Sequence, residues 1–241
     1  GACSEYICVP AERLTPVPDG VDPAEAVSLV LSYVTAYQML HRIARVKPGG
    51  RILVHGAGGA VGTAMIQLCR LNNIEVYGTA SESKHELVAG LGAVPVDYRK
   101  EDFVDRIGDL VQEGVDAVFD PIGGENLKRS FRTLKPGGLL VCYGFYNSVM
   151  GKGGSIPLDF MRLKLWSILP NQRSATFYSI GATREKHPEW FTEDLTLLFD
   201  LLENKKIRPV IGGRFHMTEA AKAYERIEIG EVNGKMILEV S

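Results

Sequence analysis

The sequence predicts a doubly wound α/β fold, in which helices cover both faces of a parallel sheet. Short segments that are apolar throughout, such as 51–55 and 115–120, alternate with segments of helical periodicity. A glycine-rich turn joins the first of these strands to its helix. The chain has 241 residues, 45% of them apolar, which is enough for a continuous core and excludes disorder.

The alternation of strands and helices begins near residue 46. Strands are expected at 51–55, 74–79, 94–97, 115–120, 139–143 and 175–180, and helices at 60–71, 82–91, 103–112, 125–134 and 158–169. Ahead of it, the alternating pattern of residues 1–10 predicts a strand, 15–22 are turn-rich, and 24–43 predict one or two helices. Beyond it come two expected helices, 189–203 and 218–227, and a closing strand at 235–240. These last elements are out of step with the alternation, so they are expected to pack with the N-terminal segment as part of a second domain.

The composition narrows the function classes and the compartment. With 27 basic and 29 acidic side chains, the chain has no positive surplus for nucleic acid or an anionic membrane. No apolar run reaches the length of a membrane span, and the start lacks a signal peptide. The four cysteines are scattered, which argues against a disulfide scaffold or a thiolate zinc cluster and favours the cytoplasm. A strand-like start without an initiator Met predicts that the chain is a piece of a longer protein.

The glycine-rich turn favours a nucleotide site. Gly56, Gly58, Gly59 and Gly62 lie between a predicted strand and a predicted helix, where backbone amides can bind pyrophosphate. The strict G-x-G-x-x-G pattern is not met, because Val61 stands at its third glycine. A purely structural turn is the alternative, but the position after the first strand of the series favours the nucleotide.

The end of the second predicted strand distinguishes the two nicotinamide cofactors. An NAD site carries an acidic residue there, whereas this strand ends in Thr79-Ala80-Ser81, with Lys84 following. A hydroxyl and an ammonium can bind a 2′-phosphate, so NADP(H) is predicted. Ser81 could instead only cap the next helix, and the two roles are compatible.

Several motifs together resemble one family. The run HGAGGAVGTAMIQLC, the segment 32–37, and the stretches GTASESKHELVAGLGA, VDYRKEDF, FDPIGG and GKMIL are similar to the zinc-independent branch of the medium-chain dehydrogenase/reductase superfamily. Within it they resemble quinone oxidoreductases of the zeta-crystallin type and the related vesicle amine transport proteins. The resemblance implies a Rossmann domain at 31–205, the end of a GroES-like catalytic domain at 1–30, and a return to that domain at 206–241.

The resemblance also implies a cofactor-binding set. This set has four parts: the phosphate turn, the 2′-phosphate site, the nicotinamide side and a C-terminal turn that closes over the cofactor. Its residues are Thr35, Ala57, Gly59, Ala60, Val61, Gly62, Thr79, Ser81, Lys84, Tyr98, Tyr143, Gly144, Phe177, Asn233 and Lys235. For Tyr98 and Phe177 the alternative is core packing.

The reaction implied is hydride transfer from NADPH to a carbonyl compound such as a quinone or an α,β-unsaturated ketone. Tyr33 is the visible candidate for a proton donor, although water could give the proton. No metal is expected, because Leu31-Ser32-Tyr33 occupies the place of a zinc-ligating Cys and the five His have no ligand spacing. The branch implies a homodimer through edge strand 175–180. The alternative function is a non-catalytic NADPH-binding sensor or partner protein.

Overall fold

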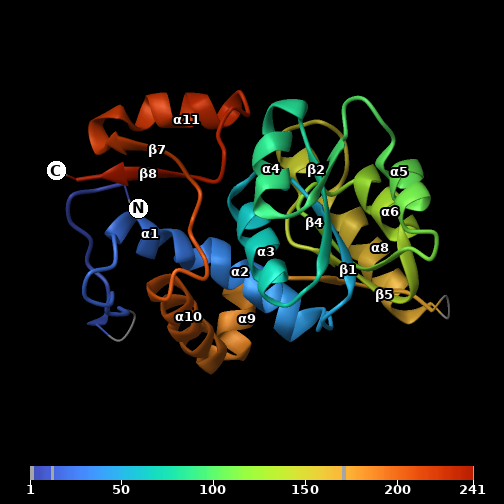
Figure 1. Ribbon diagram of the computed structural model, residues 1–241, viewed down its shortest axis with the longest axis horizontal. Helices are drawn as coiled ribbons and strands as arrows, with labels where there is room; N and C mark the ends of the chain where they lie inside the picture. Colours follow the sequence, from blue (N-terminus) through green and yellow to red (C-terminus); the bar gives the residue numbers. More distant parts are fainter. Residues whose placement is uncertain (1–2, 12–13, 170–171, 241) are drawn as a thin grey trace.

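The structure, a computed structural model, describes residues 3–11, 14–169 and 172–240. Its centre is a six-stranded parallel sheet in the order β3-β2-β1-β4-β5-β6. A separate parallel pair, β7 and β8, lies at the other end of the molecule, beside helix α11 (Figure 1). The strand order reverses beside β1, which creates a crevice at the carboxyl ends of the strands. The predicted doubly wound fold is therefore confirmed.

The strands of the large sheet are β1 (Arg51–His55), β2 (Glu75–Ala80), β3 (Val94–Asp97), β4 (Val115–Asp120), β5 (Leu134–Cys142) and β6 (Ser174–Phe177). The small sheet consists of β7 (Ile211–His216) and β8 (Lys235–Glu239). The helices and helical turns are α1 (Pro23–Ser28), η2 (Leu29–Tyr33), α2 (Val34–Tyr37), η3 (Gln38–Ile43), α3 (Ala60–Leu71), η4 (Glu82–Lys84), α4 (His85–Leu91), α5 (Phe103–Leu110), α6 (Glu125–Arg132), α7 (Tyr146–Val149), α8 (Ile156–Ile168), α9 (Ile180–Lys186), α10 (Pro188–Glu203), η5 (Met217–Glu219) and α11 (Ala220–Glu228).

Two apolar cores cover the two faces of the large sheet. In β1, Ile52 and Val54 point to a core shared with α2, α3 and α10, whereas Leu53 points to a core shared with α5, α6 and α8. Strands buried on both faces must be apolar at consecutive positions. This requirement explains why these strands appear in the sequence as continuous apolar runs.

The helical segment predicted at 24–43 is broken at Val30 and Leu31. Leu31 has a φ of 72°, which is unusual for a residue with a side chain. The break turns the chain between α1 and α2, so that Tyr33 and Val34 join the core.

The prediction of a strand at 1–10 is wrong for the residues that the structure describes. Residues 3–10 form no strand and are exposed, because no other strand of the described chain lies beside them to complete their hydrogen bonds. Residues 1 and 2 lie outside the described residues. Strand β7 was not predicted, because Gly212 and Gly213 interrupt its apolar pattern.

The return segment is fastened to the start of α1 by charged groups. Arg214 of β7 forms ion pairs with Asp22, the N-cap residue of α1, and with Glu239 of β8. Within the described residues, no helix is both long and apolar enough to cross a membrane.

Candidate nucleotide cofactor site

The glycine-rich turn is packed too tightly for side chains. A Cβ atom on Gly62 would lie 2.4 Å from the Gly56 carbonyl oxygen, and one on Gly78 would lie 2.6 Å from the Ala57 Cβ. Gly56 has a φ of 69°, which lets the chain turn directly from β1 toward α3. The Ala57 amide donates to the Thr79 carbonyl (3.0 Å), which ties this turn to the end of β2. The close packing brings the start of α3 against the sheet.

The N-terminus of α3 is open to an anion. Its N-cap residue is Gly59, so no side chain accepts from the first amides of the helix, which belong to Ala60, Val61 and Gly62. These amides and the helix dipole attract negative charge. The turn therefore has the geometry of a pyrophosphate site, and the predicted turn residues come together there.

The predicted 2′-phosphate residues stand at neighbouring strand ends. Ala80 pairs with Asp97, so Ser81 and Tyr98 follow directly from two adjacent strands. Tyr98 is 53% exposed, which rules out the alternative of core packing. Lys84 lies over Gly58, where a Cβ would come within 2.6 Å of its Cδ, and its ammonium donates to the Val232 carbonyl (2.6 Å). Partial burial lowers the pKa of Lys84 below its ordinary value.

The turn from Val232 to Lys235 joins the return segment to this site. The Gly234 amide donates to the Gly58 carbonyl (2.9 Å), and Lys235 donates to the Val30 carbonyl (3.3 Å). The Oδ1 atom of Asn233 is buried and has no hydrogen-bond partner within the described residues. A buried acceptor without a donor is costly, so this atom is a natural contact for a bound ligand. The turn thus brings Asn233 and Lys235 to the glycine-rich turn.

The remaining predicted residues lie at the ends of β5 and β6, except Thr35, which lies in α2. The Tyr143 amide donates to the Asp120 carbonyl (3.0 Å), and a Cβ on Gly144 would lie 2.9 Å from the Pro121 carbonyl oxygen. Phe177 is half-buried and stacks on Phe145 (ring centroids 5.2 Å apart), so packing accounts for part of its role. Thr35 is buried in α2, on the face of the sheet that α2 and α3 cover.

The side chain of Tyr33 is buried. It is 2% exposed, and its hydroxyl is buried without a hydrogen-bond partner among the described residues. Burial also raises the pKa of the phenol above its ordinary value. A proton donor must reach the reacting atom, so this placement does not support the predicted catalytic role of Tyr33.

A buried polar network was missed by the sequence reasoning. His55 contacts the Thr79 hydroxyl through Nδ1 (3.0 Å) and the Ser130 hydroxyl through Nε2 (2.9 Å), and Ser130 donates to Asp120 (2.7 Å). Asp120 also accepts from the Ile122 amide (2.7 Å), which fixes the loop after β4. Because Ser130 gives its one proton to Asp120, His55 must donate from Nε2 and accept from Thr79.

His55 and Asp120 therefore position the carboxyl ends of β1, β2 and β4. From the sequence alone, His55 lacks metal-ligand spacing and Asp120 is the last residue of a predicted strand. One sequence feature could have indicated this network. Asn126 and Ser130 are spaced one helical turn apart on α6, and both contact Asp120.

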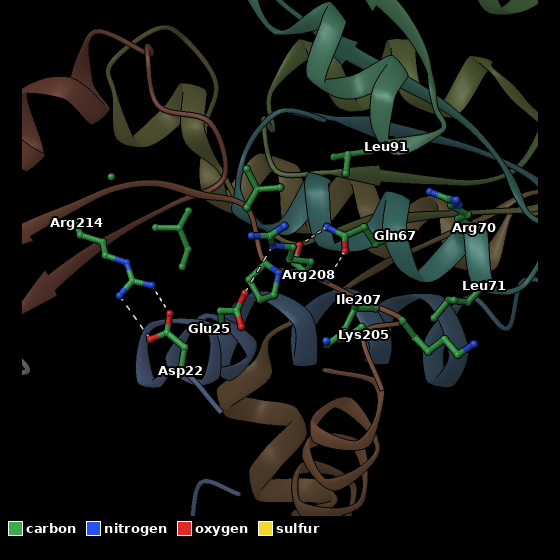
Figure 2. A pocket seen from close by; sticks show the side chains of 15 residues that line it. Asp22, Glu25, Gln67, Arg70, Leu71, Leu91, Lys205, Ile207, Arg208 and Arg214 are labelled. Carbon is green, nitrogen blue, oxygen red and sulfur yellow. Dashed lines mark hydrogen bonds and ion pairs between the residues drawn. The ribbon is translucent and has the colours of Figure 1, made fainter. Parts of the chain in front are cut away.

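A large cavity lies away from this site. It has a volume of about 890 Å³ and is formed by the C-terminal half of α3, the start of α1 and the segment 205–214 (Figure 2). No residue of the predicted cofactor set lines it.

The described residues contain no group of three or more His, Cys, Asp or Glu side chains placed to hold a metal ion.

The fold and this site define a class, the nucleotide-binding medium-chain dehydrogenases/reductases. Residues 90–238 match the zinc-binding dehydrogenase family, and the chain belongs to that family. The predicted resemblance to medium-chain dehydrogenases/reductases is thereby confirmed.

Two relatives illustrate the range of the family. The chain is 32% identical to the zebrafish (Danio rerio) synaptic vesicle membrane protein VAT-1 homolog, over 99% of this chain and 51% of the relative. It is 33% identical to mouse (Mus musculus) quinone oxidoreductase, over 99% of this chain and 69% of the relative. The chain thus spans about half the length of the first of these relatives.

Two solved structures agree with the fold. A quinone oxidoreductase from Pseudomonas syringae has a TM-score of 0.85 and 26% identity, over 99% of this chain and 71% of that chain. A mycobacterial protein solved in complex with NADPH has a TM-score of 0.79 and 28% identity, over 92% of this chain and 66% of that chain.

Proposed function

We propose that the protein is an NADPH-dependent reductase that transfers hydride to a quinone or an α,β-unsaturated carbonyl compound. The observation that carries the proposal is the cradle around Gly62, open at the α3 amides and followed at the end of β2 by Ser81 and Lys84 instead of an acidic residue. Membership of the dehydrogenase family, the similarity to quinone oxidoreductases and the NADPH complex of a structural neighbour support it.

Each part of the proposed site has a distinct task. The first amides of α3 bind the pyrophosphate, and Ser81, Lys84 and Tyr98 hold the 2′-phosphate. Asn233 Oδ1, which is buried without a partner among the described residues, accepts a hydrogen bond from the cofactor. When bound, NADPH supplies the hydride, and the protein orients the cofactor. Since Tyr33 is buried, we propose that water delivers the proton.

The organisation of the whole protein belongs to the same proposal. Residues 1–30 and 206–241 are parts of a GroES-like catalytic domain, and 31–205 form the NADP-binding domain. The reaction is independent of zinc, and the protein acts in the cytoplasm.

We propose a homodimer that forms through the sheet edge. Among the described residues, strand β6 pairs only with β5, and the helix beside it, α8, exposes Met161 (63%) and Ile168 (71%). An open edge flanked by exposed apolar side chains favours pairing of two sheets across a two-fold axis.

The first test is NADPH oxidation by the protein at its natural length with a panel of quinones and enones. Robust turnover of any of them supports the reductase.

The second test replaces Lys84. Removing a hydrogen bond to a charged group costs about 1.5–3 kcal/mol, so Lys84→Ala is expected to weaken NADPH binding roughly 10- to 100-fold and to leave NADH nearly unchanged. Lys47→Ala is the control, because Lys47 is an exposed lysine at the opposite end of β1. Equal losses for both cofactors would contradict the assignment of the 2′-phosphate site.

The alternative is a non-catalytic NADPH-binding sensor. The relatives named as synaptic vesicle membrane proteins, which match over 99% of the chain, favour it. Tight NADPH binding without turnover of any acceptor would support the sensor.

A further inference from the structure

The large cavity at the far end of α3 has the features of a separate binding site. We call it the linker cleft, because the segment 205–210 that joins α10 to β7 forms its floor (Figure 2). Arg70 in this cleft lies ten residues along α3 from Ala60, which is about 15 Å at 1.5 Å per residue. The linker cleft is therefore distinct from the pyrophosphate cradle.

The linker cleft is strongly cationic. Five basic side chains line it against two acidic ones, Asp22 and Glu25, in a chain whose formal net charge is −2. The basic residues are Arg70, Lys205, Lys206, Arg208 and Arg214.

Only two of these cations are matched within the described residues. Arg214 pairs with Asp22, and Arg208 lies 3.9 Å from Glu25. The side chains of Arg70, Lys205 and Lys206 have no hydrogen bond or ion pair with any other described residue. Three cations that line one cavity repel one another, and an anion bound among them would relieve that repulsion.

The backbone that carries the linker cations is fastened to α3. Gln67 of α3 forms two hydrogen bonds with the backbone of Arg208: its Nε2 donates to the Arg208 carbonyl (2.9 Å), and its Oε1 accepts from the Arg208 amide (2.7 Å). Figure 2 shows this clamp in the middle of the cleft, with Arg70 farther along the same helix. Because the linker is fixed to α3, the spacing between Arg70 and the linker lysines does not depend on a mobile loop. A linker backbone that is already ordered lowers the entropic cost of binding a ligand.

We propose that the linker cleft binds a small soluble molecule that carries a phosphate group of at least two negative charges. The guanidinium and the two ammonium groups match a phosphate of that charge. Leu71, Leu91 and Ile207 also line the cleft and offer apolar contacts to the organic part of such a molecule. The cavity volume of about 890 Å³ is in the range of small-molecule sites.

The test is calorimetric titration of the protein at its natural length with tripolyphosphate as the probe. It is carried out with the cofactor site saturated with NADP⁺, and again in the Gly62→Asp variant. One tripolyphosphate per chain is expected in both. The double variant Arg70→Glu/Lys206→Glu is expected to weaken it about tenfold or more, because each substitution replaces attraction by repulsion.

The matched control is Lys47→Glu with Lys186→Glu. It makes the same change in net charge at two exposed lysines, one before β1 and one on α9, outside the cleft. Absence of binding, or an equal loss in both double variants, would overturn the proposal. Binding only to vesicles that contain phosphatidylinositol phosphate would also overturn it, because the ligand would then be a lipid headgroup. NADPH binding that survives Gly62→Asp would count against the proposed cofactor site and leave the tripolyphosphate result intact.

Discussion

Replacing Gly62 by alanine tests the cradle with the smallest possible perturbation. The added Cβ would lie 2.4 Å from the Gly56 oxygen, 2.6 Å from the Ala57 Cα and 2.7 Å from the Ala57 oxygen. All three are backbone atoms and cannot rotate away. To reach ordinary contact at 3.4 Å, the turn and α3 must separate by about 1 Å.

The expected cost follows from this overpacking. A methyl group forced into a filled site destabilises a protein by about 1–3 kcal/mol. For a chain of this size each kcal/mol lowers Tm by about 2–4 °C. Because the same movement displaces the first amides of α3, NADPH affinity is expected to fall about tenfold or more.

Gly90→Ala is the matched control. Gly90 lies in α4, where a Cβ would meet nothing within 4 Å. The same substitution there is expected to stabilise the protein by about 0.5–1 kcal/mol, since alanine is the better helix former. The measurements are urea unfolding and NADPH titration of both variants. A Gly62→Ala protein as stable as the parent, with unchanged affinity, would refute the close-packed cradle.

Three further outcomes are expected. Burial lowers the pKa of His55 below 6.5, so the unfolded state takes up a proton first as pH falls. The contribution of His55 to the free energy of unfolding is therefore complete above pH 6.5 and falls below it, by up to about 1.4 kcal/mol per pH unit. Urea unfolding between pH 7.5 and 5 should show a shallower dependence of this free energy on pH in His55→Gln. An unchanged pH dependence would count against the buried neutral His55. Prolonged chelation should leave cofactor binding and activity intact, with well under one zinc per chain by elemental analysis; a stoichiometric zinc would overturn zinc independence. In sedimentation, Thr176→Lys on edge strand β6 should be monomeric while Gly62→Asp stays dimeric without binding NADPH; the reverse pattern would exclude the edge-strand dimer.

The sequence by itself determined the parts of the fold that depend on local pattern. Apolar runs without alternation require strands buried on both faces, and β1 and β4 have the predicted bounds. Gly62 and the missing acid at the end of β2 are likewise local features, because a tight turn and a strand end are fixed by a few neighbouring residues. Strand β7 and the break at Leu31 were not predicted, since no local sequence pattern marks them.

Only the tertiary structure decided which distant residues meet. Lys84 reaches the Val232 carbonyl, and Gly234 bonds to Gly58, across more than a hundred residues of chain. Residues 3–10 have a strand pattern but no partner strand, and backbone pairing depends on what lies alongside rather than on the pattern itself. The exposure of Tyr33 could not be predicted from the sequence either. Its neighbours in sequence place it near the cofactor site, but the kinked segment packs against the core and buries its hydroxyl.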